Sequence, residues 1–270
     1  MTAQAKPKTD ELMDKILSCK DGLRKINKFE RNRLISDAES LRGKIADFQL
    51  ENIFGMIFCL SGDIRKSIDY HESALKKAPD DFTNKGNYFT SLNIAGFVSK
   101  GFEFGKLMLA EYPDDIALRT SVVDDALFLG RLKDAYQFLN GFTEPENHQF
   151  YEEITSFLPI FKKVELTDDE AEKIMSFAFS ILNEKELFLS TIDANIVDDC
   201  LWIDFYVDFP EPVESVAKEI AKINWEADGI LARNANNQWF DVIMFEFKSV
   251  EVLLEEREII EKKERISGKW

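Results

Sequence analysis

The chain has 270 residues, 45% of them hydrophobic and 23 of them phenylalanine, so it can bury a substantial core and is not a disordered acidic chain. Its formal net charge of −16 disfavours nucleic acid and anionic membranes as direct partners. The first residues, MTAQAKPKTDELMDK, lack the apolar core of a signal peptide, and three scattered cysteines suit reduced thiols. We therefore expect a cytoplasmic protein.

Residues 10–46 have the spacing of helices. Leu34, Ala38, Leu41 and Ile45 recur at intervals that place them on one buried face. We expect residues 1–47 to form N-terminal helices that cap the helical repeats following them, because a stack of repeats needs its open ends covered.

An interval of 34 residues runs through the next segment. The sequence PDD at 79–81 returns at 113–115. Glycines and small residues return at the same interval: Gly62, Gly96 and Gly130, and Ser67, Gly101 and Ala135. Such a fixed period indicates an internal repeat.

Each unit is expected to contain two helices. Glycine ends the first helix without the steric penalty of a left-handed turn, and proline cannot continue the second. The small residues are expected where the second helix crosses the first closely. Asp80 and Asp114 are expected to cap the helix that begins the next unit.

These features resemble tetratricopeptide repeats, which are helix–turn–helix units of 34 residues, and the resemblance covers about three units over residues 48–149. The first unit matches the family's small, aromatic, turn and closing positions with Gly55, Phe58, Gly62, Ser67, Ala74 and Pro79. The later units depart from it, because Phe89 and Val123 stand where Gly55 stood and Asn147 replaces the closing proline.

The resemblance implies an α-α superhelix that binds a partner protein in a groove lined by the first helices. The groove positions, projected onto this sequence, are Gln49, Asn52, Met56, Thr83, Thr90, Asn93, Thr120, Asp124 and Phe128. None of them is basic, which departs from the family members that grip chaperone C-termini. We expect a basic or amphipathic partner segment, and no cofactor. A sharper hypothesis is an inhibitor- or immunity-type protein that neutralises a basic partner.

Residues 150–270 are expected to form a small α+β domain, joined to the repeats within 143–168. The helix in YEEITSFLPIF is expected to end near Pro159. Thr167 and Glu170 form a capping box for the next helix, which serves either as a C-terminal cap of the repeats or as the first helix of the new domain. The fold class is thus mainly α, a superhelix of helix pairs followed by an α+β domain.

The C-terminal part has the order helix, strand, strand, helix, strand, helix. Strands are indicated by LFLSTIDANI, by the alternation in CLWIDFYVDF, and by FDVIMFEF at 240–247. ADGILAR is a candidate for a further strand, and a charged helix is expected over 249–265. Whether this sheet contacts a partner or a second copy of the chain stays open.

An enzymatic alternative rests on Asp228, Glu246 and Lys248. The last two point to the same face of a strand, and with an aspartate on the same sheet they resemble the PD-(D/E)xK nuclease pattern. That resemblance implies carboxylates that hold Mg²⁺ and a lysine that polarises phosphate and water. The acidic net charge and the recurrence of Glu-x-Lys at Glu261 and Lys263 favour the binding protein instead.

Overall fold

The computed structural model describes residues 8–21, 25–185, 187–197, 200–208, 216–234, 243–249 and 252. The chain divides into two compact units, Met1–Asp125 and Ala126–Trp270. The architecture is mainly α with one small three-stranded sheet near the C-terminus, as expected. The helix expected over 249–265 lies almost wholly outside the described residues, and Ser249 is the last residue of a strand.

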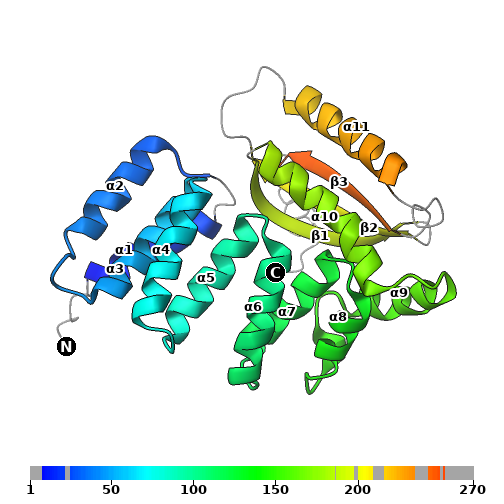
Figure 1. Cartoon of the computed structure of the whole chain (residues 1–270), viewed down its shortest axis with the longest axis horizontal. Helices are drawn as coiled ribbons and strands as arrows, with labels where there is room; N and C mark the ends of the chain where they lie inside the picture. The colour runs from blue at the N-terminus through cyan, green and yellow to red at the C-terminus, as the bar shows by residue number, and fades with distance from the viewer. Residues whose placement is uncertain are drawn as a thin grey trace, which may run out of the picture. The chain divides into compact units, whose positions relative to one another are not determined.

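The N-terminal unit is built from consecutive helices (Figure 1). They are α1 (Lys8–Asp21), α2 (Lys28–Glu39), α3 (Asp47–Leu60), α4 (Ile64–Lys77), α5 (Phe82–Ile94), α6 (Val98–Glu111) and α7 (Ile116–Phe128), the last of which continues into the C-terminal unit. Helix α3 contacts α4, and α5 contacts both α4 and α6, so that helices adjacent in sequence lie side by side. Helix α2 contacts α3 and buries Leu34 and Ala38.

The period of 34 residues is present in the geometry. The glycines that end α3, α5 and α7 have left-handed φ angles of 76°, 75° and 73°, at Gly62, Gly96 and Gly130. At each turn the next amide donates to a carbonyl five residues back, in the pairs Asp63 to Phe58, Phe97 to Leu92 and Arg131 to Ala126. This is the hydrogen bond of a glycine-terminated helix, and it orients three following helices in the same way.

The helix caps differ by one residue from the expectation. Asp81 and Asp115 cap α5 and α7, each accepting a backbone amide three residues ahead at 2.8 Å. Asp80 and Asp114, which were expected in this role, lie one position too early. The second aspartate of each PDD sequence is therefore the cap.

The small residues of the second helices are buried as expected. Ser67 and Ala135 are inaccessible, and a Cβ added to Gly101 would lie 2.1 Å from Asn93 Oδ1. The side chain of Asn93 on α5 thus occupies the space that a side chain at Gly101 of α6 would need.

At a second pair of facing positions, the large and the small residue swap helices between the first and the second repeat. In the first helix pair, the ring of His71 on α4 packs on Gly55 of α3. In the second pair, the large residue is Phe89 on α5, and it packs on Gly105 of α6, 34 residues after His71. The loss of the first-helix glycine at Phe89 is therefore offset by a glycine on the opposite helix.

The C-terminal unit follows from the end of α7. It contains α8 (Leu132–Leu139), a 3₁₀ turn (Pro145–Asn147), α9 (Tyr151–Lys163), α10 (Asp168–Glu184), β1 (Phe188–Val197), β2 (Cys200–Asp208), α11 (Val216–Asn234) and β3 (Ile243–Ser249). The strand order is β1-β2-β3, with β1 and β2 antiparallel and β2 and β3 parallel. The parallel pair is connected through α11, as a crossover requires.

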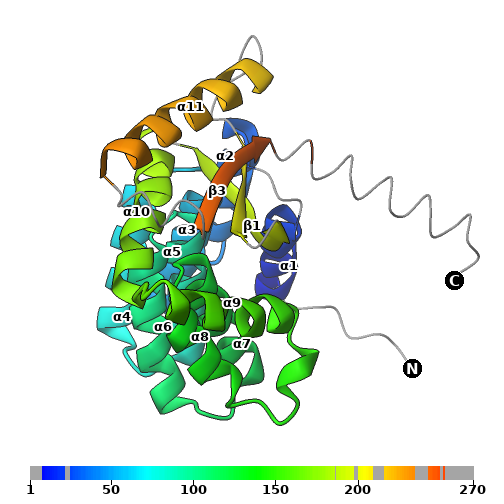
Figure 2. The ribbon, with the colours of Figure 1, turned by 90° about the vertical axis from the view of Figure 1, so that its right-hand side faces the viewer.

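Helices α10 and α11 cover the same face of the sheet (Figure 2). Phe179 of α10 meets Phe205 of β2 edge to face at 5.2 Å, and Phe205 also contacts Phe245 and Phe247 of β3. Asn224 of α11 donates to the carbonyl of Phe247 at 3.0 Å and accepts its amide at 2.8 Å. Asn224 thereby forms hydrogen bonds with the amide and carbonyl of Phe247, which lie on the side of β3 that does not pair with β2.

Helix α10 combines the two roles that the sequence left open. Its N-terminal Asp168 accepts the amides of Lys133 and Asp134, which begin α8, and its residues also pack on the sheet. Arg131 reinforces this contact by pairing with Glu172 at 2.6 Å. The capping box between Thr167 and Glu170 is present. Helix α8 therefore belongs to the C-terminal unit, which begins at Ala126, whereas the join was expected within 143–168.

Two expectations for this unit are wrong. Residues 227–233, which were a candidate strand, lie within α11, whose buried Ile223 and Ala227 have helical spacing. Helix α9 does not end at Pro159 but continues to Lys163. Buried Phe157 and Phe161 on the two sides of the proline belong to one apolar stripe, and their packing offsets the missing amide.

Candidate functional site

The groove residues expected in the second and third repeats lie at or near the surface of the N-terminal unit. Thr83 is exposed, and Thr90, Asn93, Thr120 and Asp124 are half-buried. They come from α5 and α7, the first helices of their units. Phe128 belongs to the C-terminal unit, where its ring meets Phe150 edge to face at 5.5 Å.

The first unit offers less surface than expected. Asn52 is 5% exposed and Met56 is 8% exposed, so neither presents its side chain to a partner in this structure. The physical reason is that α3 is contacted by α1 and α2 as well as by α4 and α5. Gln49 is exposed, but its side chain accepts the amide of Ala46 and caps α3. The expectation of an accessible groove is thereby corrected at Asn52 and Met56.

Asn93 links the first helices of neighbouring units. Its side-chain amide donates to both carboxylate oxygens of Asp125, each at 2.9 Å. Burial raises the pKa of Asp125 well above its usual value, and the hydrogen bond from Asn93 opposes that rise. The side chain of Asn93 is therefore used to hold α5 and α7 together.

His71 is a packing residue of the second helix α4. It is almost inaccessible, its Nε2 lies 2.8 Å from Ser91 Oγ on α5, and its ring contacts that of Tyr88. Burial lowers its pKa to about 4, so the ring is neutral at physiological pH.

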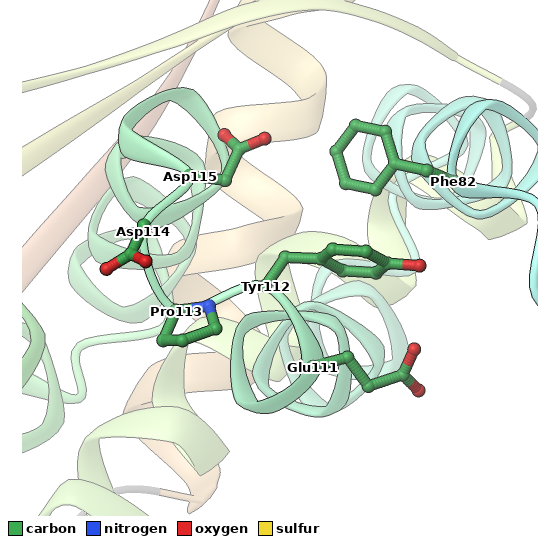
Figure 3. Close-up of a pocket in the computed structure, with 6 residues that line it drawn as sticks. All are labelled: Phe82, Glu111, Tyr112, Pro113, Asp114 and Asp115. Carbon is green, nitrogen blue, oxygen red and sulfur yellow. The ribbon is translucent and has the colours of Figure 1, made fainter.

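A pocket lies where the PDD loop at 113–115 and the end of α6 face Phe82 at the start of α5 (Figure 3). Its volume is about 480 Å³, within the range of ligand-sized clefts. It is lined by Phe82, Glu111, Tyr112, Pro113, Asp114 and Asp115.

The PDD sequences position the pocket residues. Asp115 caps α7 and so fixes the loop after Pro113, and Phe82 follows the equivalent cap at the start of α5. The rings of Phe82 and Tyr112 meet edge to face, with centroids 4.7 Å apart. Aromatic rings and carboxylates thus share one open cavity.

The pocket was not predicted from the sequence, although the two PDD loops were recognised as a repeat. The available signal was the aromatic residue beside each loop, Phe82 in APDDF and Tyr112 in YPDDI. These rings stand at different positions of the repeat, because Ala78 corresponds to Tyr112 and Ile116 to Phe82. A comparison of equivalent positions therefore does not pair them. Their contact arises because the start of α5 and the end of α6 meet within the second repeat.

The three residues of the nuclease hypothesis do not form the expected arrangement. Asp228 is exposed on α11, not at the start of a strand. Glu246 and Lys248 do lie on one face of β3, and Lys248 pairs with Asp204 of β2 at 2.7 Å. Asp204 is buried, with 4% of its surface exposed. Burial disfavours the charged Lys248, but its hydrogen bond to Asp204 raises the pKa above the usual value.

Within the residues that the structure describes, no group of three or more His, Cys, Asp or Glu side chains is arranged to hold a metal ion. None of the described helices combines the length and hydrophobicity needed to cross a membrane. Comparison with protein-family models and with curated proteins finds no match to this chain.

Proposed function

We propose that the protein binds a partner protein through its helical repeats. The observation that carries this proposal is the recurrence of one turn geometry at Gly62, Gly96 and Gly130, which joins one helix to the next at a constant interval of 34 residues. Stacked pairs of this kind form extended surfaces for macromolecules. The resemblance to tetratricopeptide repeats supports the same function.

The partner that fits this surface is basic. The chain carries a net charge of −16, and the accessible groove positions on α5 and α7 include no lysine or arginine. Complementary charge accelerates association and excludes acidic competitors. An inhibitor- or immunity-type role toward a basic protein is the specific form of this proposal.

Affinity capture with the intact chain tests the proposal. Thr83→Arg combined with Thr120→Arg places positive charge on the first helices, where Thr83 is exposed and Thr120 half-buried. Leu107→Arg is the matched control, because Leu107 is 66% exposed on the second helix α6. We expect a stoichiometric basic partner that is retained by the wild type and the control and lost by the double variant.

Two outcomes would argue against this function. One is an extract of the source cells that yields no stoichiometric partner. The other is a partner that the double variant retains as well as the control does.

The nuclease alternative is not supported to the same degree. It needs a second acidic residue beside Glu246 and Lys248, and Asp228, which was expected in that role, is exposed on a helix. The carboxylate that meets Lys248 is Asp204, and it forms an ion pair with that lysine.

A further inference from the structure

We propose that the pocket formed by Phe82, Tyr112 and Asp115 receives a lysine or arginine side chain of a basic partner segment. This inference rests on the proposed binding function and assigns the chemistry of one contact within it. It places that contact at the loops between repeats, outside the groove positions that the sequence indicated.

The aromatic part of the pocket offers a ring to an incoming cation. Phe82 is 40% exposed, and its neighbour Tyr112 is half-buried. A cation near an aromatic face is attracted by the ring's quadrupole, and the alkyl stem of lysine or arginine gains apolar contact at the same time.

The N-terminal unit already uses this chemistry beside the pocket. The ammonium of Lys85 lies 5.7 Å from the centroid of the Tyr112 ring and pairs with Glu111 at 2.5 Å. An aromatic ring next to a carboxylate thus holds a lysine within the protein. Phe82 and Asp115 offer the same combination to an external side chain.

The carboxylate part of the pocket has the charge that a cation requires. Asp115 uses Oδ1 to cap α7, and its carboxylate points toward the space beside Phe82 (Figure 3). Asp114 is exposed at the rim, with its carboxylate turned away from the rings. Arg119 donates to the carbonyl of Pro113 at 2.6 Å.

The charge balance favours a cation over an anion. The pocket is lined by the carboxylates of Glu111, Asp114 and Asp115, against the nearby cations Lys85 and Arg119. Glu111 is paired with Lys85, and the remaining carboxylates exceed the remaining cation. An anionic or purely apolar ligand would leave this excess charge uncompensated.

The test is a titration of the full-length protein with a short lysine-rich peptide, followed by NMR at about 0.15 M salt, where distant charges are screened. The reference probe is the same peptide with each lysine acetylated. We expect the lysine peptide to shift the amide signals of Phe82, Tyr112 and Asp115, and the acetylated peptide to leave them unchanged.

The repeat supplies matched control variants. Phe82→Ala removes a pocket ring, whereas Ile116→Ala shortens the equivalent residue 34 positions later, which is 69% exposed and does not line the pocket. Asp115→Asn removes a pocket charge but keeps an N-cap acceptor, and Asp81→Asn does the same at the equivalent cap of α5.

Phe82→Ala and Asp115→Asn should each weaken peptide binding by about two- to fivefold. Ile116→Ala and Asp81→Asn should leave the affinity close to that of the wild type. Equal effects of a pocket variant and its control, or equal binding of the acetylated peptide, would overturn the pocket assignment.

The two proposals fail in different ways. A captured partner that binds Phe82→Ala and Asp115→Asn like the wild type overturns the pocket and leaves the repeat function standing. Peptide binding that depends on the pocket, together with no captured partner, supports the cation site and contradicts the proposed function.

Discussion

The imidazole of His71 lies against α3 and α5, with Nε2 at hydrogen-bonding distance from Ser91 and the ring face on Gly55. Sequence patterns identified Gly55 as a repeat position but not its partner, because the contact joins residues on different helices. The burial of His71 has a measurable consequence, since protonation would place a charge in this contact.

The free energy of unfolding should depend on pH through His71. The folded pKa of about 4 lies below the unfolded value of 6.5, so the unfolded state binds more protons between these values. Stability from the neutral ring is therefore complete above pH 6.5 and is lost as the pH falls toward 4, by about 3 kcal/mol. Denaturant titrations across this range measure the slope, and His71→Asn should reduce it.

The contact between Gly55 and His71 should appear as coupling in a double-mutant cycle. A Cβ on Gly55 would lie 2.7 Å from three atoms of the His71 ring, so Gly55→Ala should destabilise the fold by about 1–3 kcal/mol. With His71→Ala the ring is absent and the cost of Gly55→Ala should disappear. Additive free energies of unfolding would contradict the contact.

At the scale of elements, the sequence predicted what depends on local chemistry. The left-handed glycines, the closely crossing second helices and the strands β1, β2 and β3 follow from residue type and spacing. Features that depend on a distant partner were not predicted. The sequence suggested that Phe89 departs from the repeat pattern, but Gly105 on the facing helix accommodates its ring. Residues 227–233 were a candidate strand but lie in α11.

Two glycines of the second unit should respond in opposite directions to alanine. Gly96 ends α5 at a φ of 75°, so Gly96→Ala should cost about 1–2 kcal/mol. Gly86 lies within α5 with open space around a Cβ, so Gly86→Ala should stabilise the fold by about 0.5–1 kcal/mol. Chemical denaturation of both variants checks this, and two changes of the same sign would contradict the assigned turn.

For the whole molecule, composition and periodicity predicted the class of architecture, mainly α with a small α+β part. The candidate site was predicted less well, because accessibility depends on which helices contact one another. Contacts to α3 from four neighbouring helices bury Asn52 and Met56, and the pocket forms where the start of α5 meets the end of α6 and the loop after it.

The net negative charge is a property of the whole molecule, and it should make the affinity for a basic partner depend on salt. With a net charge of −16, association with a basic partner should weaken as ionic strength rises. A partner held mainly by apolar contact would be insensitive to salt.

The most direct test of the binding function is the affinity of the purified partner for wild type, Leu107→Arg, and the pair Thr83→Arg and Thr120→Arg, each at low and high salt. We predict similar affinity for the wild type and Leu107→Arg, falling with salt, and loss of binding in the double variant. Equal, salt-independent binding by all three proteins would contradict recognition of a basic partner by the repeats.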